Sequence, residues 1–169
     1  MELRKLLRKF QPRRWLRLCN KELSKLITEL LGNEDWVREL SLLKNLEKYA
    51  DDEKVLTRFM EIKHTKKEQL AKYIKDTEGV EIDPDSMFDI QIKRMHEYKR
   101  QLLNAFYILD LYYRIKENPQ MDIPKTTFIF GAKAFPGYRR AKSIVKFINE
   151  IARLIDEDEE VSKKIKVHF

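Results

Sequence analysis

Apolar residues recur at helical spacing along the first half of the chain. One apolar stripe ends at Gly32-Asn33, a typical helix stop, and its members are Leu23, Leu26, Ile27, Leu30 and Leu31. A second helical stretch begins with Trp36 to Leu43, and a third runs from about Asp52 to Tyr73 between charged positions. We therefore expect a helical region that extends to about Thr77.

The pattern changes after Gly79, where short β-branched and aromatic runs alternate with longer amphipathic ones. The runs predict strands at Met87–Ile92, Thr126–Phe130 and Ile165–Phe169, with helices at about Glu97–Glu117 and Tyr138–Leu154 between them. Strands that alternate with helices of this length imply right-handed crossovers and a parallel sheet. The fold class is therefore α/β, with a β-α-β-α-β order like half of a doubly wound nucleotide-binding fold.

These patterns divide the chain into a helical lead-in over residues 1–80 and an incomplete Rossmann-like domain over residues 81–169. Parallel strands are normally buried on both faces, yet this sheet stops at its third strand, at Phe169. We therefore expect a chain truncated in the middle of a sheet, with exposed apolar edges. Such edges favour self-association or pairing with a complementary fragment, unless the lead-in covers them.

Composition excludes several classes of protein. The 169 residues are 43% hydrophobic and 37% charged, which favours one folded domain with a lead-in over a disordered chain or a large multidomain enzyme. Only four glycines and five prolines disfavour a many-turned β-sandwich or barrel. The single cysteine, Cys19, forms no internal disulfide, and no Cys/His spacing predicts a zinc or other metal site. Without a membrane-spanning run or signal peptide, we expect a cytoplasmic protein.

The formal net charge of +7 is concentrated at the start of the chain, in Met1 to Arg17. This segment has two interpretations, a nucleic-acid-binding arm or an amphipathic helix with a solvated basic side. Apolar residues at helical spacing favour the helix, namely Leu3, Leu6, Leu7 and Phe10. We therefore do not expect nucleic acid as a partner, and the role of the first eleven residues stays open.

Cations gather where the first predicted strand meets its helix, over Lys93 to Arg100. The carboxyl ends of parallel strands are where α/β sheets bind ligands, and cations at a helix amino terminus favour phosphate. An ordinary solvated basic helix start explains the same residues equally well. A second strand-to-helix segment, Gly131–Tyr138, matches neither a Walker loop nor a dinucleotide fingerprint, and a turn that needs small residues for close packing explains it.

Three segments together are similar to one known family. Phe88–Asn104 closely resembles the corresponding stretch of the glycogen, starch and maltodextrin (α-glucan) phosphorylases; Pro12–Asn20 and Gly131–Tyr138 resemble two further family motifs, in the family's order. The resemblance covers Pro12 to Phe169 and corresponds to the entry into, and first half of, the carboxyl-terminal domain of a glycosyltransferase B-type fold. It implies a pyridoxal-phosphate enzyme that transfers a terminal glucosyl unit of an α-1,4-glucan to inorganic phosphate, giving glucose 1-phosphate.

The resemblance also implies roles for single residues. Arg94 and Lys99 match the pair that holds the substrate phosphate, where two cations offset the repulsion between neighbouring phosphates. Lys93 matches the lysine next to the cofactor phosphate, and Lys99 is assigned to cofactor binding as well. Trp15 matches a tryptophan that lines the cofactor pocket, and Tyr98 matches a tyrosine near the sugar.

Tyr138 matches an aromatic residue at the mouth of the family's site, whereas we interpret His96 as structural, held by a hydrogen bond.

Departures from the family pattern matter as well. Leu7–Gln11 replaces an active-site segment, and Phe135 replaces an alanine and is expected to crowd its loop. No lysine of this chain lies in the context of the family's cofactor lysine, so no Schiff-base residue is assigned.

Three functional hypotheses follow. The first is a partial phosphorylase, which would be inactive by itself because one wall of a two-walled cleft cannot pre-organise the site; its partners would be phosphate, glucan and the rest of the enzyme. The second is a non-enzymatic module that binds phosphorylated ligands or polyanions at the basic segment. The third is a pairing module that associates with itself or with a complementary fragment through its exposed sheet edge.

Overall fold

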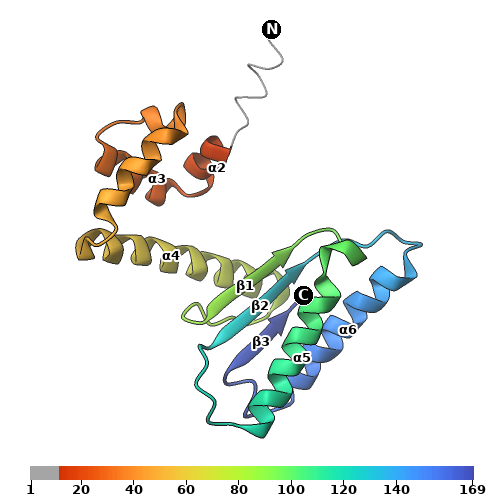
Figure 1. Cartoon of the computed structure of the whole chain (residues 1–169). Coiled ribbons are helices and arrows are strands. Elements are labelled where there is room, and N and C mark those ends of the chain that lie inside the picture. Colours follow the sequence, from red (N-terminus) through yellow and green to blue (C-terminus); the bar gives the residue numbers. More distant parts are fainter. Residues whose placement is uncertain (1–11) are drawn as a thin grey trace. The chain divides into compact units, whose positions relative to one another are not determined.

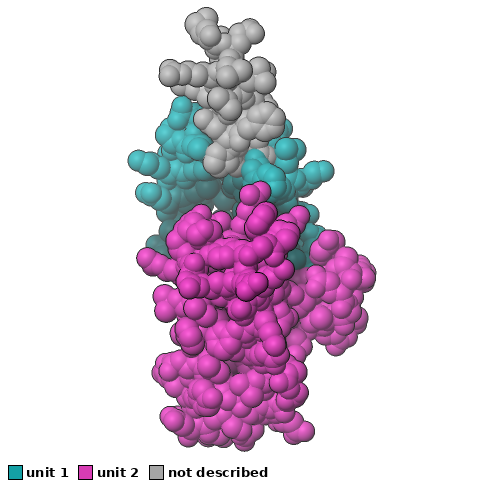
Figure 2. Space-filling view, turned by 90° about the vertical axis from the view of Figure 1, so that its right-hand side faces the viewer, with its two compact units in different colours: residues 1–70 teal, residues 71–169 magenta. Residues whose placement is uncertain are grey.

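The structure, a computed structural model, describes residues 12–169, with side chains from residue 15 onward. Contacts divide the chain into two compact units, Met1–Leu70 and Ala71–Phe169, which Figure 2 colours separately. The departing segment Leu7–Gln11 and most of the basic segment Met1–Arg17 lie outside the described residues. The predicted boundary after residue 80 lies just beyond the helix in which the two units divide, and this domain assignment stays a prediction.

The first unit is helical, as the apolar spacing predicts. Its elements are α2 (Pro12–Cys19), α3 (Lys21–Leu31), the 3-10 helices η1 (Asp35–Val37) and η2 (Leu40–Tyr49), and α4 (Glu53–Glu78), which continues into the second unit. The predicted end of α3 is confirmed: Gly32 has φ 76° and its N–H donates to the carbonyl of Thr28. The stretch from Trp36 to Leu43 is helical but lies in 3-10 rather than α geometry.

The second unit contains the predicted three-stranded parallel sheet, in the order β1-β2-β3 (Figure 1). The elements follow one another as β1 (Met87–Ile92), η3 (Glu97–Lys99), α5 (Gln101–Glu117), β2 (Thr126–Gly131), α6 (Arg139–Asp156) and β3 (Ile165–His168). The predicted alternation of strands and helices is therefore confirmed. Since β2 is the middle strand, five of its six residues are buried, whereas β1 and β3 lie at the edges.

Helices α5 and α6 lie side by side and cover one face of this sheet (Figure 1). The core between them contains apolar side chains that are at most 2% exposed, among them Ile108, Phe128, Ile148 and Ile155. Burying each such side chain contributes about 1.5–3 kcal/mol. This layer fixes the sheet and thereby the loops at its carboxyl-terminal edge.

The edge strand β1 carries exposed apolar side chains, as the incomplete sheet predicts. Ile90 is 47% exposed and Ile92 is 67% exposed on this strand. A parallel strand is ordinarily paired on both sides, whereas among the described residues β1 pairs only with β2, so its other edge offers unpaired backbone groups. Self-association through it stays a prediction.

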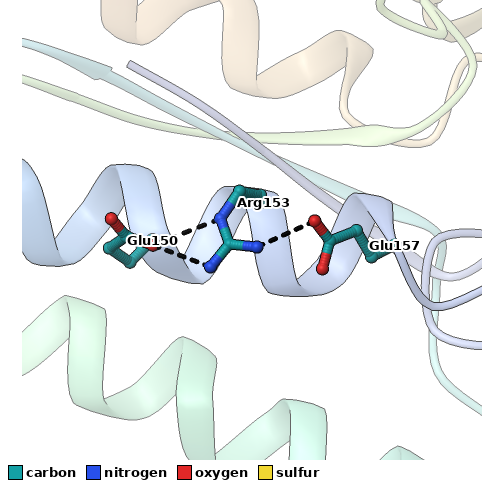
Figure 3. Close-up of polar contacts among 3 residues, drawn as sticks. All are labelled: Glu150, Arg153 and Glu157. Carbon is teal, nitrogen blue, oxygen red and sulfur yellow. Dashed lines mark hydrogen bonds and ion pairs between the residues drawn. The ribbon is translucent and has the colours of Figure 1, made fainter.

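Most charged side chains of the second unit's helices have partners of opposite sign. On α6, Arg153 bridges Glu150 and Glu157: its Nη2 lies 3.0 Å from Glu150 Oε2, and its Nη1 lies 2.8 Å from Glu157 Oε1 (Figure 3). The two carboxylates raise the pKa of the guanidinium. Such exposed pairs add little stability, but they show that this cation is compensated locally.

Candidate functional site

The basic segment begins where β1 leaves the sheet. The Lys93 N–H donates to the carbonyl of Gly131 over 2.9 Å, and the Met95 N–H donates to the carbonyl of Lys133 over 3.1 Å. The pairing of β1 with β2 therefore continues beyond both strand ends, and Met95 is buried as an anchor at 3% exposure. The two segments singled out in the sequence thus lie side by side at the carboxyl-terminal edge of the sheet (Figure 1).

The prediction that the helix begins at about Glu97 is wrong. Glu97–Lys99 forms a 3-10 turn, Arg100 adopts a left-handed conformation with φ 61°, and α5 begins only at Gln101. The left-handed residue interrupts the hydrogen-bonding run, which periodicity alone does not reveal. The cations therefore lie in the loop that precedes the helix, so a phosphate site rests on their side chains rather than on the helix amino terminus.

Three cations of this loop are not engaged by a carboxylate within residues 15–169. Lys93 and Arg94 are exposed, and Lys99 is partly buried with its Nζ 5.6 Å from the centre of the Tyr98 ring. Within residues 15–169, whose side chains are described, the structure shows no ion pair for any of the three. This contrasts with the paired Arg153 on α6 and leaves uncompensated positive charge at the edge of the sheet.

Glu97 is the only acid between Lys93 and Arg100, and residues of the second loop engage it. Tyr138 donates its hydroxyl proton to Glu97 Oε2 over 2.8 Å, and the Arg140 guanidinium pairs with Glu97 Oε1. Arg140 and Tyr138 lower the pKa of Glu97 from its ordinary value, and Glu97 in turn raises the pKa of Tyr138. The carboxylate therefore ties the two loops together and stays ionised at neutral pH.

Aromatic rings pack around this connection. The His96 ring lies 4.2 Å from the Tyr98 ring and 5.6 Å from the Tyr138 ring, measured between ring centres. The hydrogen bond expected of the His96 side chain is not seen among the described residues, and aromatic packing takes its place. Phe135 is 75% exposed, and its ring lies 3.3 Å from the position that a Cβ would take on Gly137. Crowding of the loop by Phe135 stays a prediction.

The remaining predicted residue, Trp15, lies on α2 of the first unit and is 73% exposed. Lys93, Arg94, Tyr98 and Lys99 belong to the second unit. The second unit brings together the four loop residues and Tyr138, whereas the place of Trp15 in the site stays a prediction.

Sequence reasoning missed Arg140. An exposed arginine in the first turn of a helix resembles any solvated cation, and its partner Glu97 lies 43 residues earlier in the chain. Only the adjacency of the two strands makes the pair visible. Among the residues that the structure describes, no group of three or more His, Cys, Asp and Glu side chains could hold a metal ion, and no helix is long and apolar enough to cross a bilayer.

Comparison with known proteins decides the family. The carbohydrate phosphorylase family model matches residues 9–169, nearly the whole chain. The chain belongs to the carbohydrate phosphorylase family. The match includes both loops at the edge of the sheet and the helical region that precedes them.

Curated relatives of the phosphorylase family agree with this assignment. The chain is 47% identical over 161 residues to a wheat (Triticum aestivum) α-glucan phosphorylase, H isozyme, which covers 94% of the chain and 19% of that relative. It is 47% identical to Bacillus subtilis glycogen phosphorylase, in a match that covers 93% of the chain and 20% of that relative. It is 43% identical to the liver form of human glycogen phosphorylase, in a match that covers 94% of the chain and 18% of that relative. The chain therefore spans at most a fifth of the length of these relatives.

Proposed function

We propose that the chain forms part of an α-1,4-glucan phosphorylase, an enzyme that transfers a terminal glucosyl unit to inorganic phosphate and releases glucose 1-phosphate. The observation that supports this most directly is the uncompensated cation group of Lys93, Arg94 and Lys99 in a chain of the phosphorylase family. Phosphate is the substrate that such a group recognises, because charge-assisted hydrogen bonds to its oxygens are roughly twice as strong as neutral ones. The proposed location is cytoplasmic.

In this proposal Arg94 and Lys99 hold the substrate phosphate. The guanidinium of Arg94 offers a planar fork to two oxygens, and the ammonium of Lys99 adds a compact charge. Tyr98, 70% exposed beside Lys99, takes the sugar side. Together they would stabilise negative charge that develops at the transferring oxygen.

Lys93, with Lys99, is proposed to hold the phosphate of pyridoxal phosphate, and Trp15 to line the pocket for its ring. The loop fits the phosphate end of this cofactor, because the described carboxylate nearest in sequence, Glu97, is engaged by Arg140 and does not neutralise the lysines. When bound, the cofactor supplies a phosphate group that transfers a proton. No lysine of this chain is assigned to an imine, so the fit concerns the phosphate end alone.

The isolated chain is proposed to be inactive. It supplies one wall of the site, and a reaction between phosphate and a glucan end needs both reactants held in one orientation. Glucan and the remainder of the enzyme are the partners that this proposal implies.

The test titrates the purified chain with inorganic phosphate, followed by ³¹P NMR, and separately with pyridoxal phosphate, followed by absorbance. Arg94→Ala should weaken the binding of inorganic phosphate about tenfold, which corresponds to about 1.4 kcal/mol for one charge-assisted contact. The matched control is Arg153→Ala, which removes an arginine that is also exposed but is paired with two carboxylates, and it should leave the affinity unchanged. An equal loss of affinity in both variants would overturn the proposed site. Strong imine absorbance from one lysine would overturn the statement that this chain lacks the Schiff-base lysine.

The second candidate is a non-enzymatic polyanion-binding module, favoured by the exposure of Lys93 and Arg94. It predicts that single-stranded nucleic acid competes with pyridoxal phosphate for the chain. The logarithm of the affinity for nucleic acid should then fall steeply and linearly with the logarithm of the salt concentration. Binding of phosphate compounds without such competition would favour the phosphorylase site.

A further inference from the structure

Three amide side chains, which we call the amide frame, support the basic loop: Gln91 and Gln101 bond to its backbone, and Asn104 bonds to the side chain of Gln91. The Gln101 Nε2 group donates to the carbonyls of both Lys93 and Arg94, each over 3.3 Å. Gln101 is only 1% exposed, and both bonds are partly buried.

The rest of the amide frame reaches the third cation. The Gln91 Nε2 group donates to the carbonyl of Lys99 over 3.2 Å, and Asn104 Nδ2 donates to Gln91 Oε1 over 3.2 Å. Since a carbonyl only accepts, the amide nitrogen of Gln91 must face Lys99, which leaves its oxygen for Asn104. The backbone of each of the three proposed phosphate-binding cations is thus held by an amide of the frame.

The left-handed Arg100 makes this arrangement possible. Its φ of 61° ends the 3-10 turn and starts α5 at Gln101, seven residues beyond Arg94 and eight beyond Lys93. The side chain at the first position of the helix thereby bonds back to the start of the loop. A helix that continued from Glu97 would not have this turn before Gln101.

The chemistry of the amide frame suits a site for anions. A carboxylate in place of Gln91 or Gln101 could not donate to the loop carbonyls, and it would compete with phosphate for the nearby cations. The buried Oε1 of Gln101 has no partner among the described residues, which disfavours a purely stabilising role. What the amide contributes is its pair of N–H donors to the loop.

We propose that the amide frame is a positioning device, which fixes the backbone of Lys93, Arg94 and Lys99 so that their side chains are pre-organised for phosphate. The inference rests on the proposed function, because it takes these three cations as the phosphate ligands. Pre-organised donors avoid reorganisation when the anion binds, so loosening the loop weakens affinity without removing any charge.

The decisive variant is Gln101→Met, which keeps the length of the side chain but removes both donors. The probe is inorganic phosphate, titrated into the full chain and followed by NMR, with ¹⁵N relaxation of the amides from Lys93 to Lys99 measured in the same samples. We expect roughly tenfold weaker phosphate binding and lower order in the loop, while hydrogen-exchange protection of the core is unchanged or higher. A merely structural role would lower protection and leave affinity intact in the folded fraction.

The matched control is Asn149→Ala on α6. Asn149 Nδ2 also donates to a carbonyl, that of Val145 over 2.8 Å, but on an exposed helix face outside the loop. It should change neither phosphate affinity nor loop order. If Gln101→Met does not fold, Gln91→Met on the edge strand, which releases the Lys99 carbonyl, should give the same pattern.

Two failures are distinguishable. Unchanged loop order and affinity in both frame variants would overturn the amide frame while leaving the phosphate site in place. No phosphate binding by the unaltered chain would overturn the proposed site, and with it the role of the frame in anion affinity.

Discussion

A buried pair of hydroxyl groups joins the start of β1 to the middle strand of the sheet. Ser86 is 1% exposed and Thr127 is 2% exposed, and their Oγ and Oγ1 atoms lie 2.7 Å apart. Ser86 also donates to the carbonyl of Asp83 over 2.7 Å. Because Ser86 has one hydroxyl proton and a carbonyl cannot donate, the proton between the two hydroxyls must come from Thr127.

This direction predicts unequal costs for removing each hydroxyl. Thr127→Val takes away a donor, and Ser86 keeps its own bond to Asp83, so the free energy of unfolding should fall by about 1 kcal/mol. Ser86→Ala leaves the Thr127 hydroxyl buried without an acceptor and removes the bond to Asp83, which should cost about 2–3 kcal/mol. In the Ser86→Ala background, Thr127→Val then removes the unpaired group and should restore about 1 kcal/mol.

Native-state hydrogen exchange of the β2 amides measures these changes in the second unit. Tryptophan fluorescence provides a control, because Trp15 and Trp36 are the only tryptophans and both belong to the first unit. Thr77→Val, which removes an exposed hydroxyl bonded to the Tyr73 carbonyl, should change stability by less than about 0.5 kcal/mol. A double variant less stable than Ser86→Ala alone would refute the assigned proton direction.

Two further predictions concern the core and the acid range of the second unit. Ile155→Ala, at a side chain with no exposed surface, should lower the free energy of unfolding by about 2–5 kcal/mol in the same exchange measurement, and a smaller loss would mean that the helix layer collapses around the cavity. Lys116, 2.9 Å from Asp158, together with backbone N–H groups, lowers the pKa of the Asp158 carboxyl from 3.8 to about 2. The stability from this carboxylate is present above about pH 4 and lost as pH falls toward 2. Asp158→Asn should therefore flatten the acid limb of stability against pH, measured by circular dichroism, and an unchanged limb would contradict the assignment.

Much of the fold can be predicted from the sequence because local pattern and burial are coupled. Helix α3 ends at Gly32 because glycine adopts a left-handed cap without strain. The three strands and their parallel order follow from alternating short and long apolar runs, since a crossover helix returns the chain in the same direction. The sequence predicts three strands, and a sheet of three strands has two edge strands, so exposed edges are expected as well.

The start of α5 could not be predicted in the same way. The apolar spacing continues smoothly past Glu97, and a left-handed arginine at position 100 has no signature in hydrophobicity. The consequence for the site is large, since the cations lie in a loop whose backbone carbonyls accept hydrogen bonds from amide side chains. Local propensity describes one residue's preference, whereas this turn is stabilised by bonds to residues on both sides of it.

The sequence by itself determines the family, the α/β architecture and the cations that are candidates for phosphate, because these depend on residue types at fixed spacing. Tertiary structure decides which of those charges are free to bind an anion. Glu97 lies within the basic segment and would be expected to neutralise it, yet Tyr138 and Arg140, 41 and 43 residues later, engage it instead. Only the pairing of β1 with β2 brings these residues together, since charges that are distant along the chain interact through space and not through sequence.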